Sequence, residues 1–309
     1  MGAAITGWGS ALPDKVVTNE DFAARLDTSD AWIRERTGIL ERRIGGTTAG
    51  LAVEAGRRAL ERAGVAPEEI DLLVLATTTP DQAVPATSSS VHEALGLRGG
   101  ALDLNAACAG FTYSLVVADA MIRLGQRKVL VIGAETLSRL TDFEDRATAV
   151  LFGDGAGAVV LEDGPAPDLL VAYDLGVDGS AAHLLSCEHG GTWHMEGREV
   201  FRRAVRTELR SITKVLTEAG ARPEDVALFV PHQANLRIIE AVNERLGIPM
   251  ERTAVVLDRT GNTSAASIPL ALCEAAETGR LEPGDLVLLS GFGAGMTWAS
   301  VLIRWRGSR

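Results

Sequence analysis

Cysteine and aromatic residues are scarce in this chain. Its 309 residues include three cysteines, Cys108, Cys187 and Cys273, and aromatic side chains make up 5%. The cysteines are widely spaced and form no C-x-x-C pair, which argues against a disulfide framework and against a zinc site. They indicate a protein of the reducing cytoplasm. With few aromatic rings, the core must depend on close packing at its many glycine and alanine residues.

Long apolar runs and an excess of positive charge are also absent. No run of about 18 apolar residues occurs, so we expect no membrane span. The first residues, MGAAITGWGS, lack the basic region and the long apolar core of a secretory signal. The formal net charge of −11 argues against nucleic acid or an anionic membrane as the partner. An acidic partner would need a local basic patch.

Short apolar segments alternate with amphipathic segments along the chain. Segments rich in Val and Leu and bounded by Gly or Pro are typical of strands buried on both faces; they are 70–79, 128–135, 157–163, 227–233 and 284–295. Segments with the spacing of amphipathic helices are 48–63, 110–125, 199–219, 235–246 and 264–278. This alternation predicts an α/β protein built around a mostly parallel sheet.

One helix–turn–strand segment recurs in the second half of the chain. AGVAPEEIDLLVLA (63–76) and AGARPEDVALFVPH (219–232) match in register at Ala, Gly, Pro, Glu, Leu and Val positions. Chance similarity is the alternative, but a duplication would determine the whole architecture. We therefore predict two similar halves, residues 1–163 and 164–309, that meet near residue 164.

Cys108 lies in the segment LDLNAACAGF, where a predicted strand passes into a predicted helix. The unpaired backbone N–H groups and the dipole of a helix N-terminus favour a thiolate, so we expect a lowered thiol pKa. The small neighbouring residues leave a path to the sulfur. A buried, inert cysteine is the alternative.

Two further polar residues lie at the ends of predicted elements. His232 comes off a predicted strand at the position equivalent to Ala76 of the first half, and Asn262 lies in a turn between Gly261 and Thr263. Open α/β sheets place their sites at such strand ends. Cys, His and Asn at element ends form a plausible set for nucleophilic catalysis. A structural histidine is the alternative for His232.

Three other conspicuous segments give weaker indications of a functional site. Three histidines and Cys187 gather in HLLSCEHGGTWH (183–194), but their spacing fits no familiar zinc pattern, so we expect no metal. FGDGAGAVVL (152–161) leads into a strand, unlike a dinucleotide-binding fingerprint. The turn GFGAG (291–295) can point backbone N–H groups at a developing oxyanion, or it can be a packing turn.

Three segments, NAACAGF, PHQANLRII and GNTSAASIPLAL, resemble signature blocks of the β-ketoacyl-acyl-carrier-protein synthase III family. DTSDAWIRERTGI, FGDGAGAVVLE and MEGREVF resemble further blocks, in the same order, and together the blocks cover most of the chain. The resemblance implies the thiolase fold, with two similar halves in a five-layer α-β-α-β-α arrangement, and a homodimer. It also implies a reaction, in which an acyl-CoA primer condenses with malonyl-acyl-carrier protein through an acyl-cysteine intermediate. The product is a 3-ketoacyl-acyl-carrier protein, and no metal or redox cofactor is needed.

The resemblance implies a role for each matched position. Cys108 would take the acyl group, and His232 and Asn262 would serve the decarboxylating step. The remaining implied roles are the oxyanion turn for Gly293, Ala294 and Gly295, CoA binding for Trp32, Arg36 and Arg146, active-site support for Asn235, and carrier-protein docking for Arg237.

A basic stripe follows one predicted helix. Successive four-residue steps place Arg202, Arg206, Arg210 and Lys214 on one face of the helix 199–219. A row of cations on an acidic protein suits an acidic partner such as the carrier protein. A solvated face, with cations paired to nearby glutamates, is the alternative.

The chain departs from the family pattern in three places. The segment between residues 180 and 195 is shorter than usual. Val84 occupies a position often filled by a larger aromatic side chain, in a loop that resembles the one reaching the partner subunit's acyl pocket. We therefore expect a pocket wide enough for branched or medium acyl primers. Ala294 replaces a common glycine and keeps its N–H available if its φ is negative.

Other activities of similar proteins are the alternatives. A related acyltransferase, moving the acyl group to a hydroxyl or amine, needs Cys108 and His232 but has little use for Asn262. Thiolases use a second cysteine near the C-terminus, and hydroxymethylglutaryl-CoA synthases need an acid near position 79; the chain has neither. A papain-like hydrolase leaves the CoA-binding features unexplained.

Overall fold

The computed structural model describes residues 2–164 and 169–307 of the chain. The first half forms a five-stranded sheet with the strand order β1-β7-β6-β4-β5. Its strands are β1 (Gly2–Ala11), β4 (Leu72–Ala76), β5 (Gly100–Leu104), β6 (Lys128–Thr136) and β7 (Asp154–Gly164). Its long helices are α3 (Thr48–Ala63), α4 (Thr87–Leu95) and α5 (Gly110–Arg123).

The second half forms a four-stranded sheet with the order β11-β12-β13-β8. Its strands are β8 (Leu170–Val177), β11 (Val226–Pro231), β12 (Leu286–Gly293) and β13 (Thr297–Arg304). Its long helices are α7 (Gly197–Ala219), α8 (Leu236–Leu246) and α10 (Ser267–Glu277). All the predicted helices and strands named above are present, with ends shifted by a few residues.

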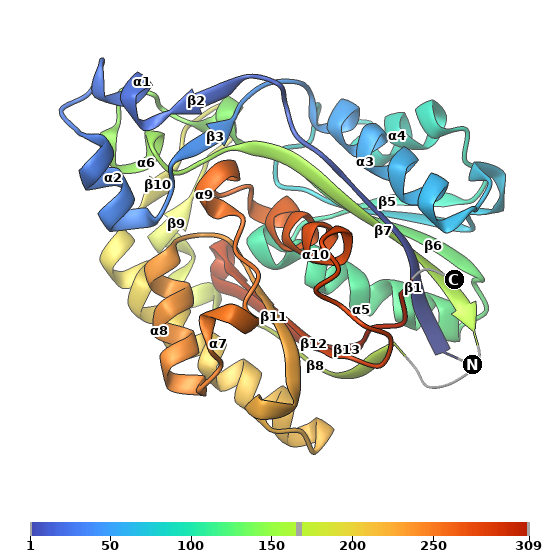
Figure 1. The fold of residues 1–309 in the computed structure, drawn as a ribbon. Coiled ribbons are helices and arrows are strands. Elements are labelled where there is room, and N and C mark those ends of the chain that lie inside the picture. The colour runs from blue at the N-terminus through green and yellow to red at the C-terminus, as the bar shows by residue number, and fades with distance from the viewer. Residues whose placement is uncertain (1, 165–168, 308–309) are drawn as a thin grey trace.

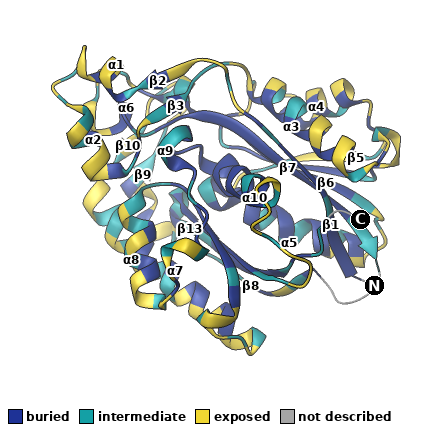
Figure 2. Ribbon diagram, in the orientation of Figure 1, coloured by how far each residue is buried: buried dark blue, intermediate teal, exposed yellow. Residues whose placement is uncertain are grey.

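The two halves stack as five layers, with α5 and α10 between the two sheets (Figure 1). The central core cluster takes apolar side chains from both sheets and from these two helices. A second cluster joins α3 and α4 to the outer face of the first sheet, and a third joins α7 and α8 to the second sheet. Figure 2 shows the sheets and central helices buried and the outer helices exposed on one face. This confirms the expected five-layer arrangement.

The repeated segment forms the same structure in each half. The first copy runs from α3 through a 3₁₀ turn at Pro67–Glu69 into β4. The second runs from α7 through a 3₁₀ turn at Pro223–Asp225 into β11. The predicted junction lies where β7 ends at Gly164, and the next residues, 165–168, fall outside the described part of the chain.

The expectation of a mostly parallel sheet is wrong. β4 runs parallel to β5 and β6, and β11 runs parallel to β12, but the other neighbouring strands of both sheets are antiparallel. β12 and β13 show the physical reason, since the turn of residues 294–296 joins them. A parallel crossover needs a dozen or more residues, so a turn of this length can only reverse the chain.

Short elements gather at one side of the sheets, at the upper left of Figure 1. They are β2 (Val16–Thr18), β3 (Glu41–Arg43), β9 (Leu185–Ser186), β10 (His194–Met195), α1 (Asn19–Ala23), α2 (Asp30–Thr37), α6 (Arg146–Ala149) and α9 (Leu257–Thr260). Several of them line the cavity described below. Within the described ranges, no helix combines the length and the apolar character needed to cross a membrane.

Candidate active site

A cavity of about 790 Å³ brings together the three predicted catalytic residues, Cys108, His232 and Asn262. Cys108 comes from the first half of the chain and the other two from the second half, so the site lies where the halves meet. Trp32, Arg36, Arg202, Asn235, Arg237 and Ala294 also line the cavity. Arg146, Arg206, Arg210, Lys214, Val84, Gly293 and Gly295 do not line it.

Cys108 lies in a 3₁₀ turn, Ala107–Ala109, immediately before α5. The second half packs directly against this turn. A Cβ at Gly293 would lie 2.6 Å from the backbone nitrogen of Cys108, so only glycine allows β12 to approach so closely. The Thr297 hydroxyl oxygen lies 2.9 Å from the carbonyl oxygens of both Ala106 and Ala294, and its single hydrogen is shared between them. These contacts join the nucleophile turn to the predicted oxyanion turn.

The Cys108 side chain is a neutral thiol in the unliganded protein. Burial raises its pKa to about 12; a Ser264 hydrogen bond lowers the pKa, the nearby Glu135 carboxylate raises it, and the Cys108 N–H lowers it. The helix terminus is present as predicted, but the expected lowering of the pKa is wrong, because desolvation outweighs these N–H groups. The thiol must therefore lose its proton as it attacks.

His232 is buried at the end of β11. Its backbone N–H donates to the Ser290 carbonyl oxygen at 2.7 Å, which ties it to the neighbouring β12. Its ring nitrogen Nδ1 lies 2.6 Å from the Ser267 hydroxyl oxygen. Burial lowers the pKa of His232 to about 3, so the imidazole is neutral at physiological pH.

The Asn262 side chain is oriented by its own turn. Its Oδ1 accepts the N–H of Ser264 at 2.9 Å. Its backbone is also held, because its N–H donates to the Leu151 carbonyl oxygen at 2.8 Å and its carbonyl oxygen accepts the Gly153 N–H at 3.0 Å. With Oδ1 occupied, the Nδ2 amide group remains to donate hydrogen bonds to a ligand.

In the predicted oxyanion turn, the backbone of Ala294 has the conformation that keeps its N–H available. Ala294 lines the cavity and does not adopt a positive φ, whereas Gly295 has φ 116°. An alanine is therefore tolerated at position 294 without turning its N–H away through a left-handed backbone.

Trp32 and Arg36 line the cavity, and Arg146 also lies against the Trp32 ring. The guanidinium carbons of Arg146 and Arg36 lie 5.1 and 5.6 Å from the centre of the Trp32 ring. Arg146 is held by the Asp27 carbonyl oxygen at 2.8 Å. Asn235 caps α8 and donates to the Arg36 carbonyl oxygen at 3.0 Å, so it fixes α2 against α8. A ring flanked by cations suits a flat, anionic ligand such as a nucleotide.

The four cations of the predicted stripe are all exposed on α7, but only Arg202 reaches the cavity. Arg202 pairs with Glu199, and Lys214 pairs with Asp174 and Glu218. Arg210 lies over the Trp298 ring at 4.8 Å. Three of the four cations in the stripe are therefore engaged by side chains of the same protein, which favours the alternative interpretation of a solvated face. Among the described residues, Arg206 has no such partner.

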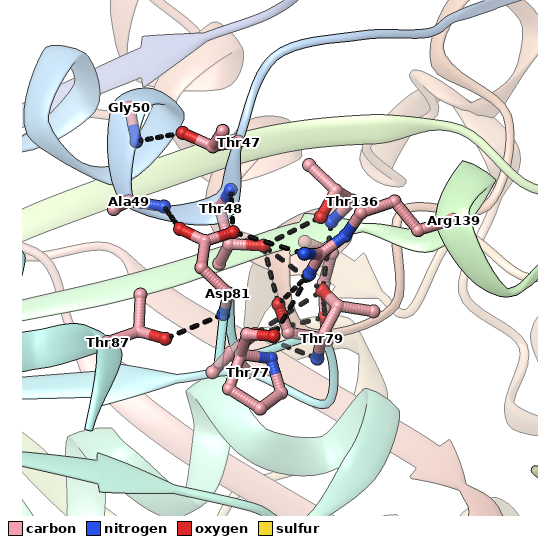
Figure 3. A network of polar contacts seen from close by, with 12 residues as sticks. Thr47, Thr48, Ala49, Gly50, Thr77, Thr79, Asp81, Thr87, Thr136 and Arg139 are labelled. Atoms are coloured by element: carbon pink, nitrogen blue, oxygen red, sulfur yellow. Dashed lines mark hydrogen bonds and ion pairs between the residues drawn. The ribbon is translucent and has the colours of Figure 1, made fainter. Parts of the chain in front are cut away.

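Val84 lies at the tip of a loop, with 84% of its surface exposed. Asp81 fixes the base of this loop, because its carboxylate accepts the N–H groups of Thr48 and Ala49 at 3.0 and 2.8 Å and pairs with Arg139 (Figure 3). Val84 does not line the cavity of its own chain. Its contact with a partner subunit stays a prediction.

Sequence reasoning missed several residues of the site. Trp193, in the segment between residues 180 and 195, packs against Phe152 with ring centres 5.3 Å apart, and both rings line the cavity. Glu208 is buried on α7 and lines the cavity, and burial raises its pKa to about 8. An acidic residue on the buried face of an amphipathic helix was the available signal. Among the described residues, no group of three or more His, Cys, Asp or Glu is arranged to hold a metal ion.

Comparisons with known proteins agree with this geometry. Residues 102–179 match the family described as 3-oxoacyl-[acyl-carrier-protein (ACP)] synthase III, and residues 216–305 match its C-terminal family. A β-ketoacyl-[acyl-carrier-protein] synthase III of Erythrobacter litoralis is 53% identical over 98% of this chain and 99% of the relative. Another, from Bacillus anthracis, is 48% identical over 99% of each.

Comparison with solved structures agrees with the comparison of sequences. The 3-oxoacyl-[acyl-carrier-protein] synthase III of Aquifex aeolicus has a TM-score of 0.97 and 47% identity, covering 98% of this chain and 100% of the other. The priming β-ketosynthase of the R1128 polyketide pathway has a TM-score of 0.94 and 37% identity, covering 99% and 96%. This chain therefore belongs to the β-ketoacyl-[acyl-carrier-protein] synthase III family.

Proposed function

We propose that this protein condenses an acyl-CoA primer with malonyl-acyl-carrier protein, through an acyl group carried on Cys108. The observation that carries the proposal is the hydrogen bond from the Ser264 N–H to Oδ1 of Asn262, which leaves the Nδ2 group free to donate to a ligand in the cavity that Asn262 lines with Cys108 and His232. A second neutral donor has a use in decarboxylation, where negative charge develops on a thioester oxygen. A simple acyl transfer has little use for it.

The first half-reaction loads the primer. Cys108 attacks the thioester carbonyl of acyl-CoA, and backbone N–H groups of Cys108 and of the turn 293–295 would hold the oxyanion. The tetrahedral intermediate collapses, the bond to CoA sulfur breaks, and the thiol proton leaves with CoA. The Trp32 ring with Arg36 and Arg146 would bind the nucleotide end of CoA, and Leu137, Phe152 and Trp193 would surround the acyl chain.

The second half-reaction forms the carbon–carbon bond. Malonyl-carrier protein loses carbon dioxide, and the electron pair of the broken bond forms an enolate. His232 and Asn262 would donate hydrogen bonds to its oxygen, and a preorganised donor of this kind contributes about 3 kcal/mol to the transition state. The enolate carbon attacks the acyl group, and the Cys108 thiolate leaves and takes up a proton. No step requires a metal or a redox cofactor.

Carrier-protein binding is proposed at the cavity mouth, not along the whole of α7. Arg202 and Arg237 line the cavity, and Arg198 joins it to a second hollow of about 580 Å³. A carrier protein that delivers its substrate into the cavity must dock at this rim. Cations there suit an acidic partner on a chain of net charge −11. From this reaction we propose that the enzyme is an acyltransferase, and from the three widely spaced cysteines that it works in the cytoplasm.

A homodimer is proposed through the edge of the first sheet. β5 is the last strand of that sheet, and its residues Gly100, Ala101 and Leu102 are exposed in the single chain. An unpaired edge strand with exposed apolar residues is a template for pairing with a second chain. A dimer formed there would protect this edge and would let Val84 serve the partner's site.

The test is intact-mass spectrometry of the protein after incubation with single acyl-CoAs, and then with malonyl-carrier protein. We expect an acyl adduct on Cys108 that disappears with release of carbon dioxide and formation of a 3-ketoacyl-carrier protein. The Cys108→Ser variant is the control and should carry no thioester adduct. An adduct that survives malonyl-carrier protein and leaves only for a hydroxyl or amine would instead establish the acyltransferase alternative.

A further inference from the structure

The neutral His232 ring carries one proton, and its position decides what the ring can do. With the proton on Nε2, the ring donates a hydrogen bond from that nitrogen. With the proton on Nδ1, Nε2 can only accept one. Nδ1 faces the Ser267 hydroxyl at 2.6 Å. The hydrogen bonds of Ser267 therefore determine the tautomer.

Ser267 lies at the start of α10, and its side chain is fully buried. Its hydroxyl oxygen accepts a hydrogen bond from the backbone N–H of Gln233 at 3.3 Å. The hydroxyl's own hydrogen takes no part in that bond and needs an acceptor. Among the described residues, the Nδ1 of His232 is the other group within hydrogen-bond distance of this oxygen. If Nδ1 carried the proton, the serine hydrogen would be buried without an acceptor, which is costly.

We propose that Ser267 is a positioning residue that donates its hydroxyl hydrogen to Nδ1 of His232 and thereby keeps the imidazole proton on Nε2. This inference rests on the proposed condensation, in which His232 acts as a hydrogen-bond donor. Ser267 does not line the cavity. It acts through His232, and the burial that lowers the His232 pKa supports the arrangement by keeping the ring neutral.

A double-mutant cycle tests this role. The measured quantity is the rate of carbon dioxide release from malonyl-carrier protein by enzyme already acylated on Cys108. We expect Ser267→Ala to lower this rate by about 10- to 100-fold, since part of one donor's contribution is lost. In the His232→Gln background the same substitution should change the rate less than about twofold, because glutamine has no tautomer to select.

A merely structural role for Ser267 predicts a different outcome. The loss would then be equal in both backgrounds, and this result overturns the proposal. Ser88→Ala is the matched control, since Ser88 is also a fully buried serine near the start of a helix, and its hydroxyl has no partner among the described residues. It should leave the rate unchanged.

Nitrogen-15 NMR of histidine-labelled protein tests the tautomer directly, without any turnover. The chain has five histidines, and the His232 signals are those lost in His232→Gln. We expect the protonated nitrogen to be Nε2 in the natural protein and a mixture of tautomers in Ser267→Ala. A proton on Nδ1 in the natural protein would refute the inference even if condensation occurs. If Nε2 is protonated but no condensation occurs, the proposed function fails and the positioning role stands.

Discussion

Burial gives Cys108 a thiol that resists ionisation, and this has a measurable consequence. Because burial raises its pKa to about 12, alkylation of Cys108 by iodoacetamide should rise about tenfold per pH unit from pH 7 to 10. The rate is measured on the Cys108 peptide by mass spectrometry. The sign follows from the thiolate being the reacting form, whose fraction grows with pH until the pKa is reached. A plateau near pH 8.5, the value of a free thiol, would show that the site does not raise this pKa.

In the proposed mechanism, Asn262 serves the second half-reaction through one side-chain group, the Nδ2 amide. Replacing it with aspartate keeps the shape, removes the Nδ2 donor and adds negative charge beside the enolate. We expect Asn262→Asp to slow carbon dioxide release by about 100-fold or more. Acylation of Cys108 by acyl-CoA, followed by intact mass, should change only a few-fold. Equal losses in both steps would show that the substitution damages the cavity in general.

The segment between residues 180 and 195 forms part of the cavity wall. It contributes Trp193, which packs on Phe152. Replacing this tryptophan with alanine removes a large ring, so Trp193→Ala should shift Cys108 acylation toward longer or branched acyl-CoAs by about tenfold, in line with the limited selectivity of apolar contacts. Acylation rates across a series of acyl-CoAs measure the shift. An unchanged preference would place the acyl chain elsewhere.

The same series tests the pocket width expected from Val84. That expectation concerned a residue of the partner subunit, while Trp193 belongs to the chain's own cavity. If the natural protein accepts only acetyl-CoA and Trp193→Ala accepts longer primers, the tryptophan limits the pocket. A natural preference for branched or medium primers would support the earlier expectation.

The proposed homodimer depends on the exposed edge of β5. Leu102 on this strand is 37% exposed in the single chain. A charge there would be buried without a partner in the proposed dimer, so Leu102→Asp should convert dimer to monomer in sedimentation velocity measurements. Leu124→Asp is the control, because Leu124 is also an exposed leucine, 81% exposed at the end of α5. A dimer that survives Leu102→Asp would place the interface elsewhere.

Much of the molecule could be predicted from the sequence because local patterns repeat and motifs are continuous. The repeated segment predicted two similar halves, and the pattern of apolar residues predicted the helices and strands. Cys108, His232 and Asn262 were each found at an element end within a short motif. Their meeting in one cavity followed from the resemblance and is now described by the structure.

What the sequence by itself determined was therefore the order of elements, the duplication and the candidates for the reacting groups. Only the tertiary structure decided the protonation of those groups, since desolvation depends on atoms far away along the chain. The turn of Cys108 packs against β12, and Nδ1 of His232 lies beside the hydroxyl of Ser267, 35 residues further along the chain. The tertiary structure also decided that Trp193 and Glu208 line the cavity, and that paired carboxylates neutralise part of the basic stripe. Sequence patterns depend on residues that are neighbours along the chain, whereas burial and hydrogen bonds depend on residues that the fold brings together from distant parts of the chain.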